Sequence, residues 1–223
     1  MATRWRPRLP DRPAETPRIR ELPAPRRTEG IIGTFLGRVF AWPYRLALAG
    51  LYRSGIRPWH LTALSLAANA VIAWLLLTGR FLLPGLLLAV AGLLDIFDGG
   101  VARLRGEASR AGAFLDSVVD RISDLLLFGS LFWVLAGQGQ RLAAALTLVG
   151  LIVSLMVSHI RAEAEAVGLS LSEGLMQRLE RYIALIIGLC VPGALLPVLV
   201  VLAGLGSLTL AQRAFSSWRQ LGG

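Results

Sequence analysis

The sequence of 223 residues has no lysine, a single cysteine and only two histidines. Because one thiol has no second thiol to pair with in the chain, Cys190 excludes an internal disulfide bond. Basic and aromatic residues do not form a sustained interleaved pattern, so the sequence gives no argument for nucleic-acid binding. The first 30 residues are charged and proline-rich, and we therefore expect no cleavable signal peptide.

Apolar residues make up 55% of the chain, and the mean hydropathy of +0.62 exceeds that of ordinary soluble proteins. Several apolar runs approach 20 residues, about the length that spans a bilayer. The net charge of +9 comes from arginine alone. In a membrane protein this charge is typical of cytosolic loops and of contact with anionic head groups. We predict an all-α integral membrane protein.

The chain divides into three parts. Residues 1–30 contain eight arginines and six prolines and cannot bury a core, which predicts a disordered cytosolic tail. Residues 31–56 place Trp42 and Tyr44 beside arginines, which is typical of an amphipathic helix lying in the membrane interface. Pro43 is expected to kink or interrupt that helix. Residues 57–219 form the predicted membrane domain.

Six apolar segments in this domain are predicted to cross the membrane as helices, at residues 58–78, 81–105, 112–136, 141–166, 175–191 and 195–218. The connections after the first, third and fifth segments carry only Arg80 and Arg141, whereas the opposite side collects most other arginines. Since arginine marks the cytosolic side, we expect both termini in the cytosol and a multi-pass protein of the plasma membrane.

Residues 95–124 hold five of the six aspartates, between two strongly apolar runs. A carboxylate inside a membrane helix is costly, so such a cluster is a functional hypothesis. Helical spacing places Asp95 and Asp98 on one face, and Asp116 and Asp120 on one face of the next helix. Four facing anions repel unless cations lie between them, and carboxylate oxygens suit Mg²⁺ or Mn²⁺.

These residues also match a longer pattern, D-x2-D-G-x2-A-R-x8-G-x3-D-x3-D, which begins at Asp95 and ends at Asp120. The pattern resembles the signature of the CDP-alcohol phosphotransferases, which transfer a phosphatidyl-type group from a CDP-linked donor to an alcohol and release CMP. The resemblance implies two metal ions. Asp95 and Asp116 would bridge both ions, Asp98 would complete the first, and Asp120 would ligate the second and act as the catalytic base.

The same resemblance implies a subsite for CDP-diacylglycerol. Residues 58–62 resemble the family's Pro-[Asn/Asp]-x-x-Thr segment, but Trp59 replaces the polar residue. Trp59 either stacks on the cytosine base or anchors its helix at the interface. Arg103 offers a guanidinium fork to phosphate. The predicted donor-binding residues are Pro58, Trp59, His60, Leu61, Gly99, Ala102, Arg103, Ser109 and Gly112.

A group of arginines further along the chain predicts where the acceptor binds. Ser158 and Arg161 share a helical face, and Arg181 and Arg213 are expected at the same cytosolic end. These arginines suit a phosphorylated acceptor, or else meet lipid head groups under the positive-inside rule. The segments SHIRAEAEAVGL and MQRLERYIAL resemble bacterial phosphatidylinositol phosphate synthases, which implies inositol 1-phosphate as the acceptor and a homodimer.

Several alternatives remain open. A phosphatidylglycerophosphate synthase would use glycerol 3-phosphate as its acceptor. A membrane prenyltransferase would need a second aspartate-rich motif, and no aspartate follows Asp124. A cation transporter would place ionisable residues near the midplane on several helices, whereas these lie at one face. Asp124, with Arg121 nearby, is expected to form a local ion pair; the alternative is a carboxylate that supports the site from behind the metal ligands.

Overall fold

The computed structural model describes residues 41–106, 109–169 and 176–222, which form helices and no strand. The predicted all-α class is confirmed for this part of the chain. The predicted tail at 1–30 and the first residues of the predicted interfacial helix lie outside it. The helices are α2 (Ala41–Arg53), α3 (Pro58–Leu77), α4 (Leu82–Arg105), α5 (Arg110–Gly137), α6 (Arg141–Ala166), α7 (Arg178–Cys190) and α8 (Leu195–Gln220).

Local sequence signals set several helix ends. Pro58 is the first residue of α3, where the fixed backbone angle of proline suits a helix start. The α4 helix ends at Gly106, whose φ of 66° is left-handed, a conformation that glycine adopts without steric cost. These ends lie close to the predicted ones because capping depends on neighbouring residues.

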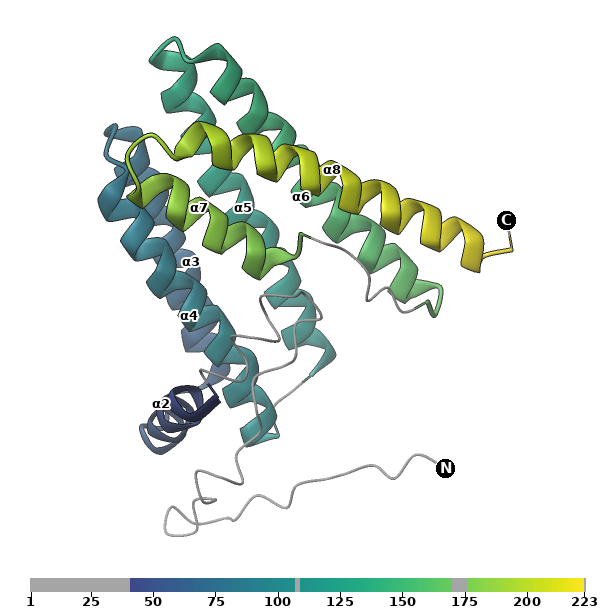
Figure 1. Ribbon diagram of the computed structural model, residues 1–223. Coiled ribbons are helices and arrows are strands. Elements are labelled where there is room, and N and C mark those ends of the chain that lie inside the picture. Colours follow the sequence, from purple (N-terminus) through teal and green to yellow (C-terminus); the bar gives the residue numbers. More distant parts are fainter. Residues whose placement is uncertain (1–40, 107–108, 170–175, 223) are drawn as a thin grey trace.

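Six of the helices form a closed ring (Figure 1). In order of contact they are α3, α4, α7, α8, α6 and α5, and α5 returns to α3. Buried leucines and Phe128 form the common core. Small residues allow close approach, since a Cβ on Gly206 of α8 would lie 2.9 Å from Val153 of α6.

The α2 helix lies across one end of the ring and contacts α4 (Figure 1). Its buried Tyr44 and Leu48 pack in a second apolar cluster with residues of α3 and α4, while Trp42 is 64% exposed. This two-sided character fits the predicted interfacial helix. The described helix includes Pro43 and runs on to Arg53; the residues before Ala41 lie outside the described part, so the expected kink or interruption at Pro43 stays a prediction.

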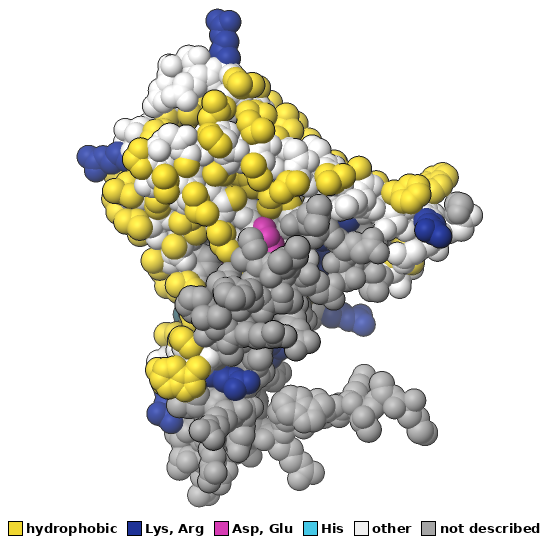
Figure 2. Space-filling view, in the orientation of Figure 1, with side chains coloured by type: hydrophobic (Ala, Val, Ile, Leu, Met, Phe, Trp, Pro, Cys, Tyr) yellow, Lys and Arg dark blue, Asp and Glu magenta, His cyan; other side chains and the backbone are white. Residues whose placement is uncertain are grey.

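Within the described residues, four helices are long and apolar enough to cross a membrane: α3, α4, α6 and α8. The α5 helix has 28 residues but carries the site's charged side chains, and α7 has only 13 residues. The predicted count of six crossings therefore stays a prediction. Many leucine, valine and tryptophan side chains on these helices are exposed, and Figure 2 shows hydrophobic side chains spread over the face of the molecule in view, as expected for a surface that faces lipid.

Candidate metal and substrate site

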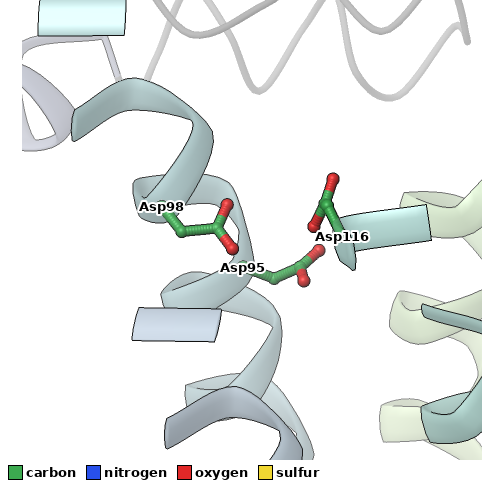
Figure 3. Close-up of side chains that lie close together, drawn as sticks. All are labelled: Asp95, Asp98 and Asp116. Atoms are coloured by element: carbon green, nitrogen blue, oxygen red, sulfur yellow. The ribbon is translucent and has the colours of Figure 1, made fainter. Parts of the chain in front are cut away.

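Carboxylates of α4 and α5 converge near one end of the ring. Asp95 and Asp98 project from α4 toward Asp116 of α5 (Figure 3). One oxygen from each of these three carboxylates lies within 4.8 Å of the others. Asp98 is 6% exposed, and its Oδ2 accepts a hydrogen bond of 3.0 Å from the hydroxyl of Thr62. Three of the four predicted metal-ligating residues are thus brought together.

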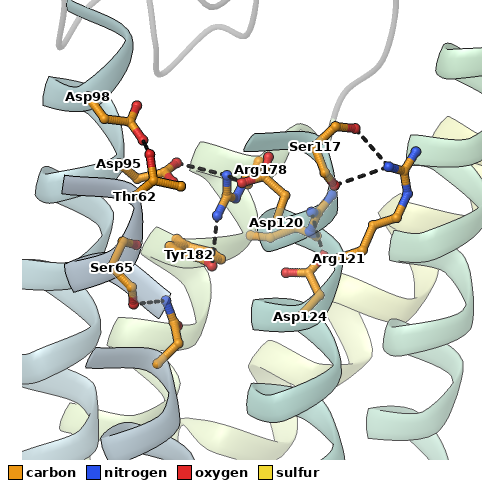
Figure 4. A network of polar contacts seen from close by, with 12 residues as sticks. Thr62, Ser65, Asp95, Asp98, Ser117, Asp120, Arg121, Asp124, Arg178 and Tyr182 are labelled. Atoms are coloured by element: carbon orange, nitrogen blue, oxygen red, sulfur yellow. Dashed lines mark hydrogen bonds and ion pairs between the residues drawn. The ribbon is translucent and has the colours of Figure 1, made fainter. Parts of the chain in front are cut away.

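The fourth predicted ligand, Asp120, lies one turn further along α5 and meets an arginine. Nη1 of Arg178 is 2.8 Å from Oδ2 of Asp95 and also contacts Oδ1 of Asp120. Nη2 of Arg178 donates a 3.3 Å hydrogen bond to the hydroxyl of Tyr182. Figure 4 shows this guanidinium between the carboxylates of the two helices. It offsets part of their negative charge.

The donor set fits a divalent metal ion. Hard cations such as Mg²⁺ and Mn²⁺ prefer oxygen ligands, and the close carboxylates supply them from two rigid helices. The side chain of Asp95 is 19% exposed, so the site is partly shielded from water. This shielding strengthens the attraction between the carboxylates and a cation.

Three predicted donor-binding residues follow Asp98 on α4. A Cβ on Gly99 would lie 3.4 Å from Nη1 of Arg103, so this guanidinium lies along the open side of the glycine. Ala102 and Arg103 are both half-buried. These three predicted donor-binding residues share one stretch of α4, next to the carboxylates.

The other predicted donor-binding residues fall into two groups. At the start of α3, Trp59 is 60% exposed and stacks on His60 with ring centroids 3.8 Å apart, while Pro58 is half-buried. Leu61 is 2% exposed and packs in the core against α2 and α4, so its side chain braces α3. The second group is Ser109 and Gly112, which cap the start of α5: the amide of Gly112 donates a hydrogen bond of 3.0 Å to the hydroxyl of Ser109.

The predicted acceptor-binding arginines come from three helices. Arg181 of α7 and Arg213 of α8 are 7% and 4% exposed, respectively, and Arg213 donates to the carbonyl of Val157 at 3.2 Å. The positive charges of Arg161 and Arg181 both repel the positive charge of Arg213. We call Arg161, Arg181 and Arg213 the arginine cluster. Ser158 is half-buried on α6.

Two members of this region have acidic partners. Arg161 is solvent-exposed and its Nε lies 2.9 Å from Oε1 of Glu165 on the same helix. Nη2 of Arg181 lies 3.1 Å from Oδ2 of Asp124. The expected local pair of Asp124 with Arg121 is therefore wrong. Arg121 instead donates to the hydroxyl and carbonyl oxygens of Ser117, at 2.7 and 3.0 Å.

Sequence reasoning missed Arg178 as a site residue. It was treated as one of many arginines on the cytosolic side, yet it contacts two predicted metal ligands. One signal was available, because Arg178 and Arg181 are three residues apart and therefore share a face of α7. A helix face that carries two arginines at its start indicates an anionic partner.

Comparison with known proteins agrees with this geometry. Residues 56–214 match the CDP-alcohol phosphatidyltransferase family. A phosphatidylinositol phosphate synthase of Mycobacterium marinum is 37% identical over 183 residues, which cover 78% of each chain.

Solved structures give the same result. The crystal structure of Mycobacterium tuberculosis phosphatidylinositol phosphate synthase with CDP-DAG bound has a TM-score of 0.70 and 34% identity. The match covers 77% of this chain and 92% of that one. The same enzyme in complex with manganese and citrate has a TM-score of 0.71, with 77% and 87% covered. The similarity therefore extends to a metal-binding protein of the same helical architecture.

Proposed function

Because this chain belongs to the CDP-alcohol phosphatidyltransferase family, we propose that it transfers a phosphatidyl group from CDP-diacylglycerol to inositol 1-phosphate and releases CMP. The observation that carries the proposal is the convergence of Asp95, Asp98 and Asp116 within 4.8 Å at one end of an apolar ring of helices. A site at that position is reached by a water-soluble nucleotide and by a lipid. The similarity to phosphatidylinositol phosphate synthases supports the acceptor.

The aspartates would bind two divalent ions, Mg²⁺ or Mn²⁺. Asp95 and Asp116 would be shared by both ions, Asp98 would complete the first and Asp120 would bind the second. When bound, the ions neutralise negative charge on the transferring and leaving phosphoryl groups. Arg178 lies beside Asp95 and Asp120 and adds a further positive charge. The carboxylate oxygens on two packed helices support this ligand set.

Asp120 is the proposed base. Its carboxylate accepts the proton of the acceptor hydroxyl as the hydroxyl oxygen attacks the phosphorus of the phosphatidyl group. The bond between that phosphorus and the bridging oxygen breaks, and CMP leaves with the bridging oxygen. Asp120 suits this task because it stands one turn away from the group of three carboxylates and is partly open, with 30% of its side chain exposed.

The arginine cluster is the proposed site for the phosphate of the acceptor. Guanidinium groups bind phosphate through charge and paired hydrogen bonds. The cluster lies close to the carboxylates along α7, because Arg178 and Arg181 are one turn apart on that helix. An acceptor held by its phosphate in the cluster would extend its hydroxyl toward Asp120. Ser158 adds a hydroxyl donor on α6.

We also propose that α5 and α7 cross the membrane, which makes six crossings. At the start of α7, Arg178 pairs with Asp95 of α4. At its end, the Sγ of Cys190 lies 3.9 Å from the carbonyl oxygen of Leu82 at the start of α4. The α7 helix therefore covers the same depth as residues 82–95 of α4, about 20 Å of a bilayer core of about 30 Å. With the arginine-rich end in the cytosol, the site would lie within the cytosolic part of the membrane. A homodimer in the plasma membrane, with both termini cytosolic, completes the proposal.

The purified protein tests this function through CMP release from CDP-diacylglycerol with Mg²⁺. Inositol 1-phosphate, glycerol 3-phosphate, inositol and serine are compared as acceptors under identical conditions. Turnover with inositol 1-phosphate alone supports the proposal. Turnover with glycerol 3-phosphate instead assigns the chain to phosphatidylglycerophosphate synthesis, and CMP release that no acceptor or metal changes contradicts the proposed reaction.

A further inference from the structure

Asp124 joins three helices beneath the carboxylates. It lies on α5, is 3% exposed, and its Oδ2 accepts hydrogen bonds from the hydroxyl of Ser154 on α6 and from Nη2 of Arg181 on α7. Figure 4 shows Asp124 one turn further along α5 than Asp120. Asp116, Asp120 and Asp124 therefore follow one another at four-residue spacing on a single helical face. Asp124 is the one that turns toward the arginine cluster.

The ion pair of Asp124 and Arg181 is buried, which limits how much it can stabilise the fold. Burying two charges gives little net stability, but removing one partner leaves the other uncompensated. The contact uses Nη2 of Arg181, while its Nε is buried and has no hydrogen-bond partner. A guanidinium has five N–H donors. Asp124 therefore holds one nitrogen of the Arg181 guanidinium through a single carboxylate oxygen and leaves other donors for an anion.

The surroundings explain why such a carboxylate is needed. The positive charges of Arg161 and Arg181 act against that of Arg213. Glu165 and Asp124 offset part of this repulsion, and the three arginines together keep an excess of positive charge for an anion. The negative charge of Asp124 reduces that repulsion through its contact with Arg181. Ser154 is 1% exposed, and its hydroxyl bond holds the Asp124 carboxylate in one orientation. The acidic partner of Arg181 is thus itself held by a neighbouring helix.

We propose that Asp124 is a positioning residue that holds the Arg181 guanidinium toward the phosphate of the acceptor, with Ser154 fixing the carboxylate. The inference rests on the proposed function, because it assumes that the arginine cluster binds a phosphorylated acceptor. Asp124 does not touch the substrate. Its effect is transmitted through Arg181 and falls on acceptor binding, while the donor subsite on α4 stays intact.

The test measures the KM for inositol 1-phosphate and for CDP-diacylglycerol separately. Asp124→Asn keeps the shape of the side chain and removes its charge, and we expect the acceptor KM to rise about tenfold or more while the donor KM changes less than about twofold. Ser154→Ala should raise the acceptor KM by a smaller factor, in the same direction. Ser123→Ala is the matched control. Ser123 adjoins Asp124 on α5, is fully buried and has an unpartnered hydroxyl, so both KM values should stay unchanged.

A double variant separates positioning from general damage. In an Arg181→Ala background, Asp124→Asn should raise the acceptor KM no further, because the residue it positions is gone. Additive effects overturn the inference, as do equal rises in the two KM values or an acceptor KM unchanged by Asp124→Asn. If Asp124→Asn fails to fold, the same criteria apply to Ser154→Ala. A wild-type protein that transfers to no phosphorylated acceptor overturns the proposed function, and this inference with it.

Discussion

Asp120 differs from the other predicted metal ligands because it stands outside the group of three carboxylates that converge within 4.8 Å. As the proposed base, it must accept a proton during transfer. Asp120→Asn keeps the volume but has no basic oxygen, so kcat should fall about 100-fold to 10,000-fold. CMP release by the folded variant at saturating Mg²⁺ measures this. Near wild-type turnover would remove Asp120 from that role, and Arg121→Ala serves as the control because Arg121 bonds to Ser117 of its own helix.

Arg178 neutralises carboxylates that otherwise repel one another. Arg178→Gln should lower the free energy of unfolding in EDTA by about 1–3 kcal/mol, because Asp95 and Asp120 lose a charged donor. Divalent cations bind more tightly where negative charge is greater, so saturating Mg²⁺ should restore most of the lost stability. Thermal unfolding with and without Mg²⁺ checks this. Equal losses of Tm in both conditions would contradict the charge argument.

The sequence predicts which residues form the site better than it predicts which side chains they pair with. Asp95, Asp98 and Asp116 were predicted to meet because their spacing fixes the face of each helix, and the helices are adjacent in the ring. The partner of Asp124 was predicted wrongly. Arg181 is 57 residues away, and its contact depends on how α7 packs against the ring, which no local pattern specifies.

At the scale of elements, α2 is packed directly against the motif-bearing end of α4. The ring of Tyr44 stacks on Phe97 with centroids 5.3 Å apart. A Cβ on Gly100 would lie 2.3 Å from the hydroxyl of Tyr44 and 3.0 Å from Leu48. The glycine is therefore required for α2 to seat on α4. Since Arg103 is one turn beyond Gly100, this packing also steadies the proposed donor subsite.

Gly100→Ala should lower the free energy of unfolding by about 1–3 kcal/mol, the usual effect of overpacking. It should also raise the KM for CDP-diacylglycerol more than the KM for the acceptor. Adding Tyr44→Phe removes the clashing hydroxyl and should recover part of both losses. Gly129→Ala is the control, because a Cβ there meets nothing within 4 Å. Thermal unfolding and steady-state kinetics measure the effects, and a Gly100→Ala protein as stable as the control would contradict the packing argument.

The sequence predicts helix ends well where a residue with a strong backbone preference marks the end, and poorly where no such residue is present. Pro58 and Gly106 mark the start of α3 and the end of α4 with residues whose backbone preferences are strong. The predicted fifth helix began at residue 175, whereas α7 begins at Arg178. The apolar pattern continues through residues 175 and 176, so hydropathy alone gave no signal for the later start.

For the whole molecule, the distribution of arginine predicts the orientation in the membrane. The connections at the end of the ring away from the carboxylates carry only Arg80 and Arg141 among residues 78–80, 138–141 and 191–194. The end that holds the carboxylates carries many more, at Arg57, Arg103, Arg105, Arg110, Arg161, Arg178, Arg181, Arg213 and Arg219. Positive charge is retained on the cytosolic side, so the site should open to the cytosol, where a nucleotide donor is available.

Single-cysteine labelling tests this orientation together with the count of six crossings. In a Cys190→Ala background, Arg110→Cys and Gln220→Cys should react with a membrane-impermeant maleimide in inside-out vesicles. Gln138→Cys should react in right-side-out vesicles, and all three should react in detergent. An odd number of crossings between Arg110 and Gln220 would put these two on opposite sides. Since α6 and α8 are long and apolar enough to cross and Gln138 tests α5, agreement between Arg110 and Gln220 then requires α7 to cross as well. Labelling of Gln220→Cys from outside would mean that the short α7 does not cross, and labelling of Arg110→Cys from outside would reverse the orientation.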